Sequence, residues 1–128
     1  MRQILFLIVL VLCIGCKKTT NSNEQTKIVS PEEMQTLLQL DDVQLVDVRT
    51  PQEYKDGYID NALNIDFLSS DFKEKIEKLE KEKPVIVYCR SGKRSSKCTE
   101  VLVEAGFKKI YDLEGGFTKW KQKGLKSQ

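Results

Sequence analysis

Residues 84–95 read Pro84-Val85-Ile86-Val87-Tyr88-Cys89-Arg90-Ser91-Gly92-Lys93-Arg94-Ser95. The apolar run at the start is typical of a buried strand, and a helical pattern begins after the basic end. Cys89 is therefore expected at the carboxyl end of a strand, facing the amino end of a helix, where backbone N–H groups and the helix dipole favour negative charge. Three cations within five residues, Arg90, Lys93 and Arg94, add positive charge. Because such surroundings stabilise a thiolate, the stretch predicts nucleophilic chemistry on an anionic substrate.

The remaining sequence predicts helices that alternate with strands. Two capping boxes, each with proline at the first helical position, open helices at Ser30–Glu33 and Thr50–Glu53. Further helices are expected over Phe72–Leu79, on the face formed by Cys98, Val101, Leu102 and Ala105, and over Gly116–Lys123. Strands are expected at Val43–Val48, Asn61–Ile65, Val85–Tyr88 and Lys109–Leu113. This order predicts an α/β fold whose parallel sheet is covered by helices on both faces, with the ligand site at the carboxyl ends of the strands.

Four segments resemble motifs of the rhodanese family of sulfurtransferases, in the family's order. They are the active-site loop Cys89–Ser95, the strand end Asp47-Val48-Arg49, the segment Glu53–Ile65, and the closing segment Leu113–Trp120. The resemblance runs from about residue 28 to residue 124. It implies a three-layer rhodanese-like fold, with a five-stranded parallel sheet, over residues 27–126.

The resemblance also implies an activity. Cys89 would attack the outer sulfur of thiosulfate or a similar small anionic donor, form a persulfide and release sulfite, and a thiol or cyanide would then accept the sulfur. A protein is another possible acceptor, and no cofactor is expected. The loop residues that would bind the substrate are Arg90, Ser91, Gly92, Lys93, Arg94 and Ser95. The two arginines are favoured over the lysine because a guanidinium matches the geometry of an oxyanion, and glycine lets the loop adopt unusual backbone angles.

The sequence departs from the family pattern at two positions. Tyr58 stands where the family commonly has histidine, and since the chain has no histidine, a mechanism with a histidine base is excluded. Asn61 stands where glycine is common, and because asparagine tolerates positive φ, the turn is expected to survive.

Several residues near the expected site have two interpretations. Asp47 and Arg49 either brace the cysteine loop or form only a local turn and ion pair. Cys98 lies on an apolar helix face and is expected to pack without reacting, although it is also placed to resolve a persulfide or disulfide on Cys89. Tyr58 either faces the pocket or, as is favoured, packs as an aromatic, and Phe117 and Trp120 are expected in the core.

Other functions remain open beside sulfur transfer. A rhodanese module that binds a partner without catalysis is one alternative, and a persulfide carrier that delivers sulfur to a partner protein is another. A cysteine phosphatase or arsenate reductase is less favoured, because phosphatases need an arginine six positions after the cysteine. Ser95 takes that position here, and Arg94 comes one residue early.

The first residues form a signal-peptide pattern. A positive start, Met1–Gln3, precedes the apolar run Ile4–Ile14, and the residues up to Cys16 resemble a bacterial lipoprotein box. We expect a signal peptide at 1–15, lipidation of Cys16 and a flexible polar tether at 16–26. The protein would then be exported and anchored by lipid to a bacterial membrane, with ordinary secretion or an uncleaved anchor as the alternatives.

Composition limits the remaining possibilities. The 128 residues carry a formal charge of +2, which is too weak to argue for a nucleic-acid partner, and lysines are interleaved with acids throughout. Cys13 and Cys16 belong to the signal, so only Cys89 and Cys98 remain for the domain. Two cysteines do not make a disulfide framework. Without histidine or ligand spacing, no metal site is expected.

Overall fold

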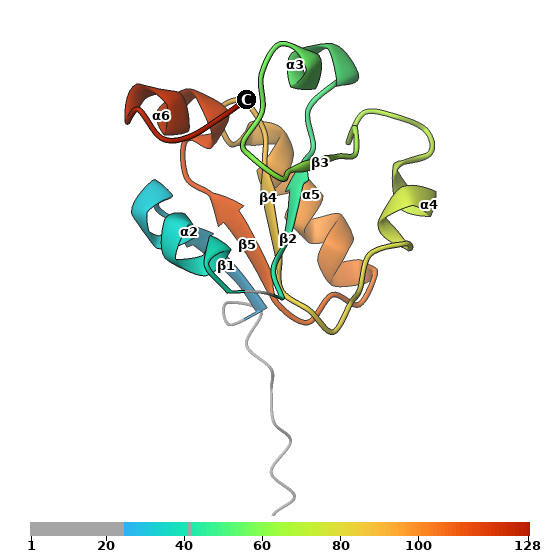
Figure 1. Ribbon diagram of the computed structural model, residues 1–128. Coiled ribbons are helices and arrows are strands. Elements are labelled where there is room, and N and C mark those ends of the chain that lie inside the picture. The colour runs from blue at the N-terminus through green and yellow to red at the C-terminus, as the bar shows by residue number, and fades with distance from the viewer. Residues whose placement is uncertain (1–24, 41) are drawn as a thin grey trace, which may run out of the picture.

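Parallel strands form the sheet at the centre of the molecule, in the order β1-β5-β4-β2-β3 (Figure 1). The computed structural model describes residues 25–40 and 42–128. The strands are β1 (Thr26–Val29), β2 (Gln44–Asp47), β3 (Leu63–Asn64), β4 (Val85–Tyr88) and β5 (Ile110–Leu113). Every neighbouring pair runs parallel, which confirms the expected five-stranded parallel sheet. Cys89 directly follows β4 and therefore lies at the carboxyl edge of the sheet. Because β4 is the central strand, this position is at the middle of that edge.

Helices cover both faces of this sheet, as expected for three layers (Figure 1). They are α2 (Pro31–Leu38), α3 (Pro51–Lys55), α4 (Phe72–Ile76), α5 (Lys93–Glu104) and α6 (Gly116–Gln122). Buried residues of α4 and α5 form one core with one face of the sheet, and those of α2 and α6 form a second core with the other face. Phe117 and Trp120 belong to the second core, as expected.

Local sequence sets where two of these helices begin. The Ser30 hydroxyl accepts a hydrogen bond from the Glu33 backbone N–H at 3.1 Å, and the Thr50 hydroxyl accepts one from the Glu53 N–H at 3.3 Å. In both capping boxes the glutamate side chain also accepts from the N-cap backbone N–H. Each box satisfies donors that a helix start leaves free. The second box fixes α3 directly after the carboxyl end of β2.

The edge strand β1 does not follow from the residue pattern, which predicts only the other four strands. Val29 is its one buried residue, and Ile28 is 66% exposed, so the segment carries little apolar signal. Its place comes from pairing with β5, where Ile28 lies beside Asp112. Pairing with a distant segment is invisible to a local pattern.

The ends of the domain differ slightly from the expected boundaries. β1 begins at Thr26, inside the range 16–26 expected as a tether, and Ser127 pairs with Ile59. The expected signal peptide, Cys16 and the tether up to residue 24 lie outside the described residues. Within the described part of the chain, no helix is long and apolar enough to cross a bilayer.

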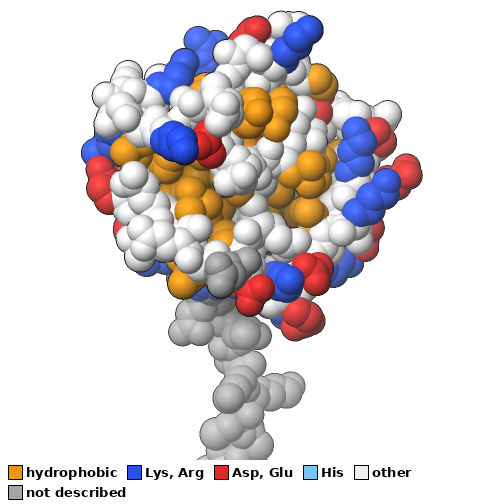
Figure 2. Space-filling model, viewed as in Figure 1, with side chains coloured by type: hydrophobic (Ala, Val, Ile, Leu, Met, Phe, Trp, Pro, Cys, Tyr) orange, Lys and Arg blue, Asp and Glu red, His pale blue; other side chains and the backbone are white. Residues whose placement is uncertain are grey.

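Basic and acidic side chains are interleaved on the face drawn in Figure 2, with apolar surface between them. Exposed ion pairs such as Lys123–Glu32 at 2.6 Å and Lys119–Glu114 at 2.9 Å likewise join a lysine to an acid. The arrangement agrees with the alternation of lysines and acids along the sequence.

Candidate functional site

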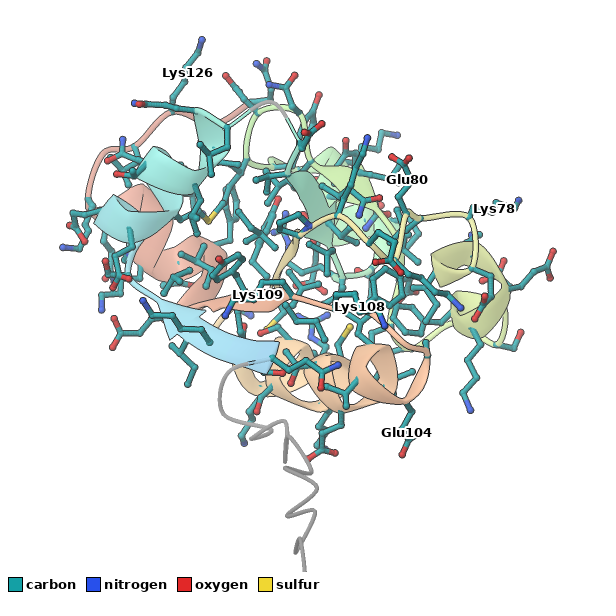
Figure 3. The ribbon with its side chains drawn as sticks, turned by 90° about the horizontal axis from the view of Figure 1, so that it is seen from below. Lys78, Glu80, Glu104, Lys108, Lys109 and Lys126 are labelled. Carbon is teal, nitrogen blue, oxygen red and sulfur yellow. The ribbon has the colours of Figure 1, made fainter. Side chains whose placement is uncertain are left out.

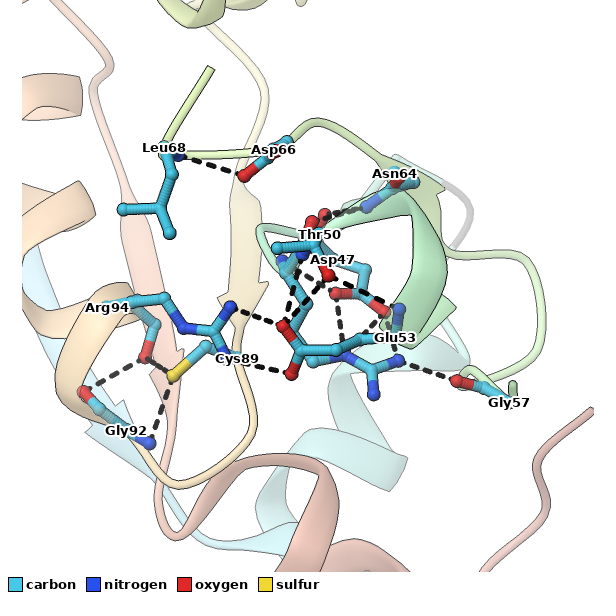
Figure 4. A network of polar contacts seen from close by, with 12 residues as sticks. Asp47, Thr50, Glu53, Gly57, Asn64, Asp66, Leu68, Cys89, Gly92 and Arg94 are labelled. Atoms are coloured by element: carbon cyan, nitrogen blue, oxygen red, sulfur yellow. Dashed lines mark hydrogen bonds and ion pairs between the residues drawn. The ribbon is translucent and has the colours of Figure 1, made fainter. Parts of the chain in front are cut away.

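Cys89 lies at the base of the loop that joins β4 to α5, and the residue is only 1% exposed. The Gly92 N–H points at the sulfur, with a distance of 3.1 Å from N to Sγ, and Figure 4 shows this contact. The thiol also lies 3.5 Å from the Ser95 hydroxyl oxygen. Gly92 has φ +110°, a left-handed angle that residues with a Cβ resist. The glycine expected to shape the loop therefore does so.

Hydrogen bonds to the Cys89 sulfur together outweigh the effect of burial on the pKa of its thiol. Burial alone would raise the pKa of the Cys89 thiol, but the Ser95 hydroxyl and the backbone N–H groups of Ser95, Gly92 and Ser91 act in the other direction and hold it below its ordinary value. The loop thus stabilises a thiolate mainly with N–H and O–H donors. No histidine base is needed for this ionisation.

The first residues of α6 hold the backbone of the cysteine loop through two hydrogen bonds. The Phe117 N–H donates to the Cys89 carbonyl at 2.8 Å, and the Thr118 N–H donates to the Arg90 carbonyl at 3.0 Å. These contacts require a close approach at Gly116, where an added Cβ would lie 2.5 Å from the Cys89 carbonyl oxygen. The paired glycines of the Leu113–Trp120 segment therefore have a specific role in seating the loop.

Arg94 is engaged with a carboxylate of α3. Its two terminal nitrogens contact the Glu53 oxygens at 2.6 and 2.8 Å (Figure 4), a bidentate geometry that is among the strongest for ion pairs. The Arg94 guanidinium lowers the pKa of Glu53 to about 2, against a smaller opposing effect of burial. Arg94, which was expected to bind the anion, therefore forms an ion pair that links α3 to the cysteine loop. Glu53 was not among the expected site residues, although it stands in one of the quoted motifs.

The other two loop cations, Arg90 and Lys93, are exposed. Arg90 lines a hollow of about 360 Å³ together with Arg49 and Lys121. Glu53 and Asp56 also line it, so the hollow is mixed in charge. Its cations follow the ends of β2 and β4 or belong to α6.

Asp47 and Arg49 form a buried ion pair, with 2.6 Å between Arg49 Nη2 and Asp47 Oδ2. The Arg49 backbone N–H also donates to Asp47 Oδ1 at 2.9 Å, so the local turn is present. Arg49 reaches further, since it donates to the Gly57 carbonyl at 2.6 Å and lies over the Phe117 ring at 4.4 Å. Because the Phe117 N–H holds the Cys89 carbonyl, the pair contacts the residue that seats the loop. Both interpretations of the pair thus describe part of its geometry.

The two departures from the family pattern have local explanations. Asn61 has φ +66°, which fits the expectation that asparagine preserves the turn. Tyr58 stacks on Tyr54 with 4.1 Å between ring centroids, so it is the packed aromatic that was expected.

Cys98 lies on the buried face of α5 with no exposed surface. Burial raises the pKa of its thiol to about 12, which keeps it in the unreactive protonated form. Both Cys89 and Cys98 are free thiols. The second cysteine of the domain therefore has the environment of a packing residue.

The chain is similar to several proteins of one family. A model of the rhodanese-like domain matches residues 30–123. The thiosulfate sulfurtransferase GlpE of Coxiella burnetii (strain RSA 331 / Henzerling II) is 41% identical over 95 residues, covering 74% of this chain and 87% of that protein. The tRNA uridine(34) hydroxylase of Chlamydia pneumoniae is 38% identical over 109 residues, covering 80% of this chain but 33% of that protein.

Solved structures share the arrangement as well as the sequence. The rhodanese-related protein of Thermoplasma volcanium has a TM-score of 0.71 at 30% identity, and the match covers 80% of this chain and 97% of that one. A rhodanese-like domain protein of Staphylococcus aureus has a TM-score of 0.67 at 33% identity, covering 78% and 96%. The family model spans most of the described residues and includes the whole loop that surrounds Cys89. The chain therefore belongs to the family of rhodanese-like domains.

Proposed function

We propose that the protein is a sulfurtransferase that moves a sulfane sulfur from thiosulfate or a similar donor to a thiol or cyanide through a persulfide on Cys89. The observation that carries this proposal is the environment of the Cys89 sulfur. It is buried at the end of β4 and surrounded by the N–H groups of its own loop, with the nearest at 3.1 Å. Such a cradle stabilises negative charge on sulfur both before and after a sulfur atom is added.

The reaction needs two displacements. The Cys89 thiolate attacks the outer sulfur of thiosulfate, and a bond forms between Cys89 Sγ and that sulfur. The bond between the outer and inner sulfurs of thiosulfate breaks, and sulfite leaves with its electron pair. The terminal persulfide sulfur then carries the negative charge. In the second displacement the acceptor attacks that terminal sulfur, and Cys89 leaves as the thiolate. The loop N–H groups would stabilise the charge on sulfur at each stage.

The loop cations have different parts in this proposal. Because Arg94 is paired with Glu53, its main effect is to hold the loop against α3. Arg90 and Lys121 line the nearby hollow and would attract the anionic donor, while Asp47 and Arg49 would support the loop through Phe117. Ser91, Gly92 and Ser95 would act through their donors to sulfur, and Lys93 would add only exposed positive charge.

The relatives support this activity, although they are not all named for it. One relative at 41% identity is named a thiosulfate sulfurtransferase, whereas another carries the matching region as a third of a tRNA uridine(34) hydroxylase. The domain therefore occurs in proteins with different activities. A persulfide carrier for a partner protein, or a module without catalysis, would differ from a sulfurtransferase in turnover with small acceptors.

Intact mass measurement of the full chain, before and after thiosulfate, tests the proposal. We expect a gain of one sulfur atom that cyanide removes and that Cys89→Ser lacks. A persulfide that forms but does not transfer to cyanide or small thiols would indicate a carrier. Failure to gain sulfur while Cys89 stays free and reduced would contradict the proposal.

We also propose that the protein is exported and held to a membrane by lipid on Cys16. The support for this is the signal-peptide pattern of residues 1–15 and the lipoprotein box that ends at Cys16. Cys16→Ser should release the protein from the membrane fraction. If the variant stays bound and Met1 is still detected at its N-terminus, the lipid anchor is wrong.

A further inference from the structure

The hollow of about 360 Å³ beside the cysteine loop is lined by charged side chains of two kinds. Those of the first kind are neutralised within the protein, since Arg49 is paired with Asp47 at 2.6 Å and Glu53 is paired with Arg94 at 2.6 Å. Neither pair needs a ligand to balance its charge. The charge that a ligand meets is therefore set by the other charged residues of the hollow.

The second kind is without an oppositely charged partner within the described part of the chain. Two of these residues are positive, Arg90 and Lys121, and one is negative, Asp56. All three are exposed. Lys121 lies over the Phe117 ring at 4.9 Å, and Asp56 accepts a hydrogen bond from the neutral side chain of Gln52 at 3.1 Å. A bound molecule can therefore pair with two positive charges and one negative charge.

The hollow adjoins the backbone that carries Cys89. The Phe117 N–H donates to the Cys89 carbonyl at 2.8 Å. The Thr118 N–H donates to the carbonyl of the next residue, Arg90, at 3.0 Å. Phe117, Thr118 and Arg90 all line the hollow. A small molecule seated there consequently lies beside the loop whose cysteine would bear the persulfide.

The carboxylate of Asp56 does not suit the donor or cyanide. Thiosulfate is a dianion, and cyanide attacks as an anion, so an unpaired carboxylate opposes the approach of both. The same carboxylate attracts a molecule that carries an ammonium group. The cations Arg90 and Lys121 attract a carboxylate, which a guanidinium can bind through two hydrogen bonds. The three charges together match a zwitterion better than they match a simple anion.

We propose that the sulfur acceptor is a zwitterionic thiol, with its carboxylate at Arg90 and Lys121 and its ammonium group at Asp56. Amino-acid thiols and short peptide thiols have this chemistry, and Asp56 is then a residue that determines specificity. This inference rests on the proposed function, because it names the class of molecule that takes the sulfur from Cys89.

The transfer itself keeps the form of the second displacement. The acceptor thiol gives its proton to water, and its thiolate forms a bond to the terminal persulfide sulfur. The bond from that sulfur to Cys89 Sγ breaks, and the electron pair stays on Cys89. The acceptor leaves as a persulfide anion, and Cys89 returns to the thiolate.

Four small thiols test the charges of the hollow separately. Free cysteine carries both charged groups, 3-mercaptopropionate lacks the ammonium group, cysteamine lacks the carboxylate, and 2-mercaptoethanol lacks both. The full chain is loaded with thiosulfate and freed of excess donor, and the loss of the added sulfur atom to each thiol is followed by intact mass at one pH. Rates are compared as ratios between thiols, because the intrinsic reactivity of each thiol then cancels between variants.

Asp56→Asn should lower the ratio of the free-cysteine rate to the 3-mercaptopropionate rate about threefold, the size expected for an exposed charge pair. Lys121→Gln should lower the ratio of the free-cysteine rate to the cysteamine rate by about the same factor. The ratio of the parental rates should be kept by the matched controls, Glu104→Gln and Lys108→Gln. They remove the same charges from exposed positions at the end of α5 and just before β5, away from Cys89 (Figure 3).

An unchanged ratio in either hollow variant, or an equal change in its control, would overturn the zwitterionic acceptor. Uptake of sulfur from thiosulfate is scored first and tests the sulfurtransferase by itself. If Cys89 takes up no sulfur, the hollow is probed with S-methylcysteine, which has both charged groups but no reactive thiol. NMR shifts at the Thr118 and Lys121 N–H groups that Asp56→Asn weakens would support the site, and an absence of shifts would overturn it.

Discussion

Replacing Gly116 with alanine is expected to displace the cysteine loop from α6. The added methyl group would lie 2.5 Å from the Cys89 carbonyl oxygen and 2.7 Å from both the carbonyl carbon and the carbonyl oxygen of Arg90. These are backbone atoms, so no flexible side chain can move to make room. The loop and the start of α6 must separate, and the hydrogen bonds from the Phe117 and Thr118 N–H groups, at 2.8 and 3.0 Å, lengthen or break.

The size of this effect follows from two contributions. Gly116 has φ +57°, and a left-handed angle costs a non-glycine residue about 1–2 kcal/mol. Alanine also lowers the conformational entropy of the unfolded chain, which offsets about 0.5–1 kcal/mol of this cost. The two hydrogen bonds add about 1 kcal/mol each. Gly116→Ala should therefore lower the free energy of unfolding by about 3 kcal/mol.

Gly124→Ala is the matched control for backbone strain. Gly124 has a similar φ of +68°, but nothing lies within 4 Å of the position of its Cβ, so it should lose only about 1 kcal/mol. Urea denaturation gives both free energies, and single-turnover mass measurement gives the rate of sulfur loading on Cys89. We expect slow loading in Gly116→Ala and a parental rate in Gly124→Ala. Equal destabilisation of the two variants, with equal loading rates, would refute the proposed seating of the loop by α6.

The remaining predictions concern Glu53 and Cys98. The folded-state pKa of Glu53, about 2, lies below its ordinary value of 4.5, so the Arg94 pair contributes stability that is present above pH 4.5 and is lost as the pH falls toward 2. Glu53→Gln should then lower the free energy of unfolding by about 1–2 kcal/mol at pH 7, after discounting for solvent screening, and by almost nothing near pH 2. Urea denaturation at both pH values measures this difference. An equal loss at both pH values would contradict the ion pair. Cys98→Ala should cost about 1 kcal/mol from lost packing and leave persulfide formation on Cys89 unchanged, and a variant that no longer releases its sulfur would identify Cys98 as a resolving thiol after all.

Local signals predicted the helices and the shape of the cysteine loop well, for a physical reason. The capping boxes at Ser30 and Thr50 depend on contacts within one helical turn, and the contact between Gly92 and Cys89 spans three residues. β1 was not predicted from its own residues, because an edge strand with one buried side chain has no clear period. The number of strands came instead from the resemblance to a family.

The parts of the site that sequence patterns missed are the long-range contacts. Arg94 was expected to face the substrate, but its partner Glu53 is 41 positions away along the chain, and no local pattern indicates that pair. The closeness of Gly116 to the Cys89 carbonyl has the same origin.

Backbone N–H groups and cationic side chains have different roles around Cys89, and the basic sequence of the loop alone does not indicate this difference. Arg90 and Lys93 are exposed, so water and salt screen their charges, and Arg94 is matched by a carboxylate. The Gly92 N–H points at a buried sulfur, where the local dielectric is low and a dipole acts strongly. The exposed cations therefore suit the capture of an anion from solution, while the backbone donors suit the charge on sulfur after capture. Gly92 and Gly116 are consequently as important to the proposed chemistry as the arginines, because they set the path of the backbone that holds Cys89.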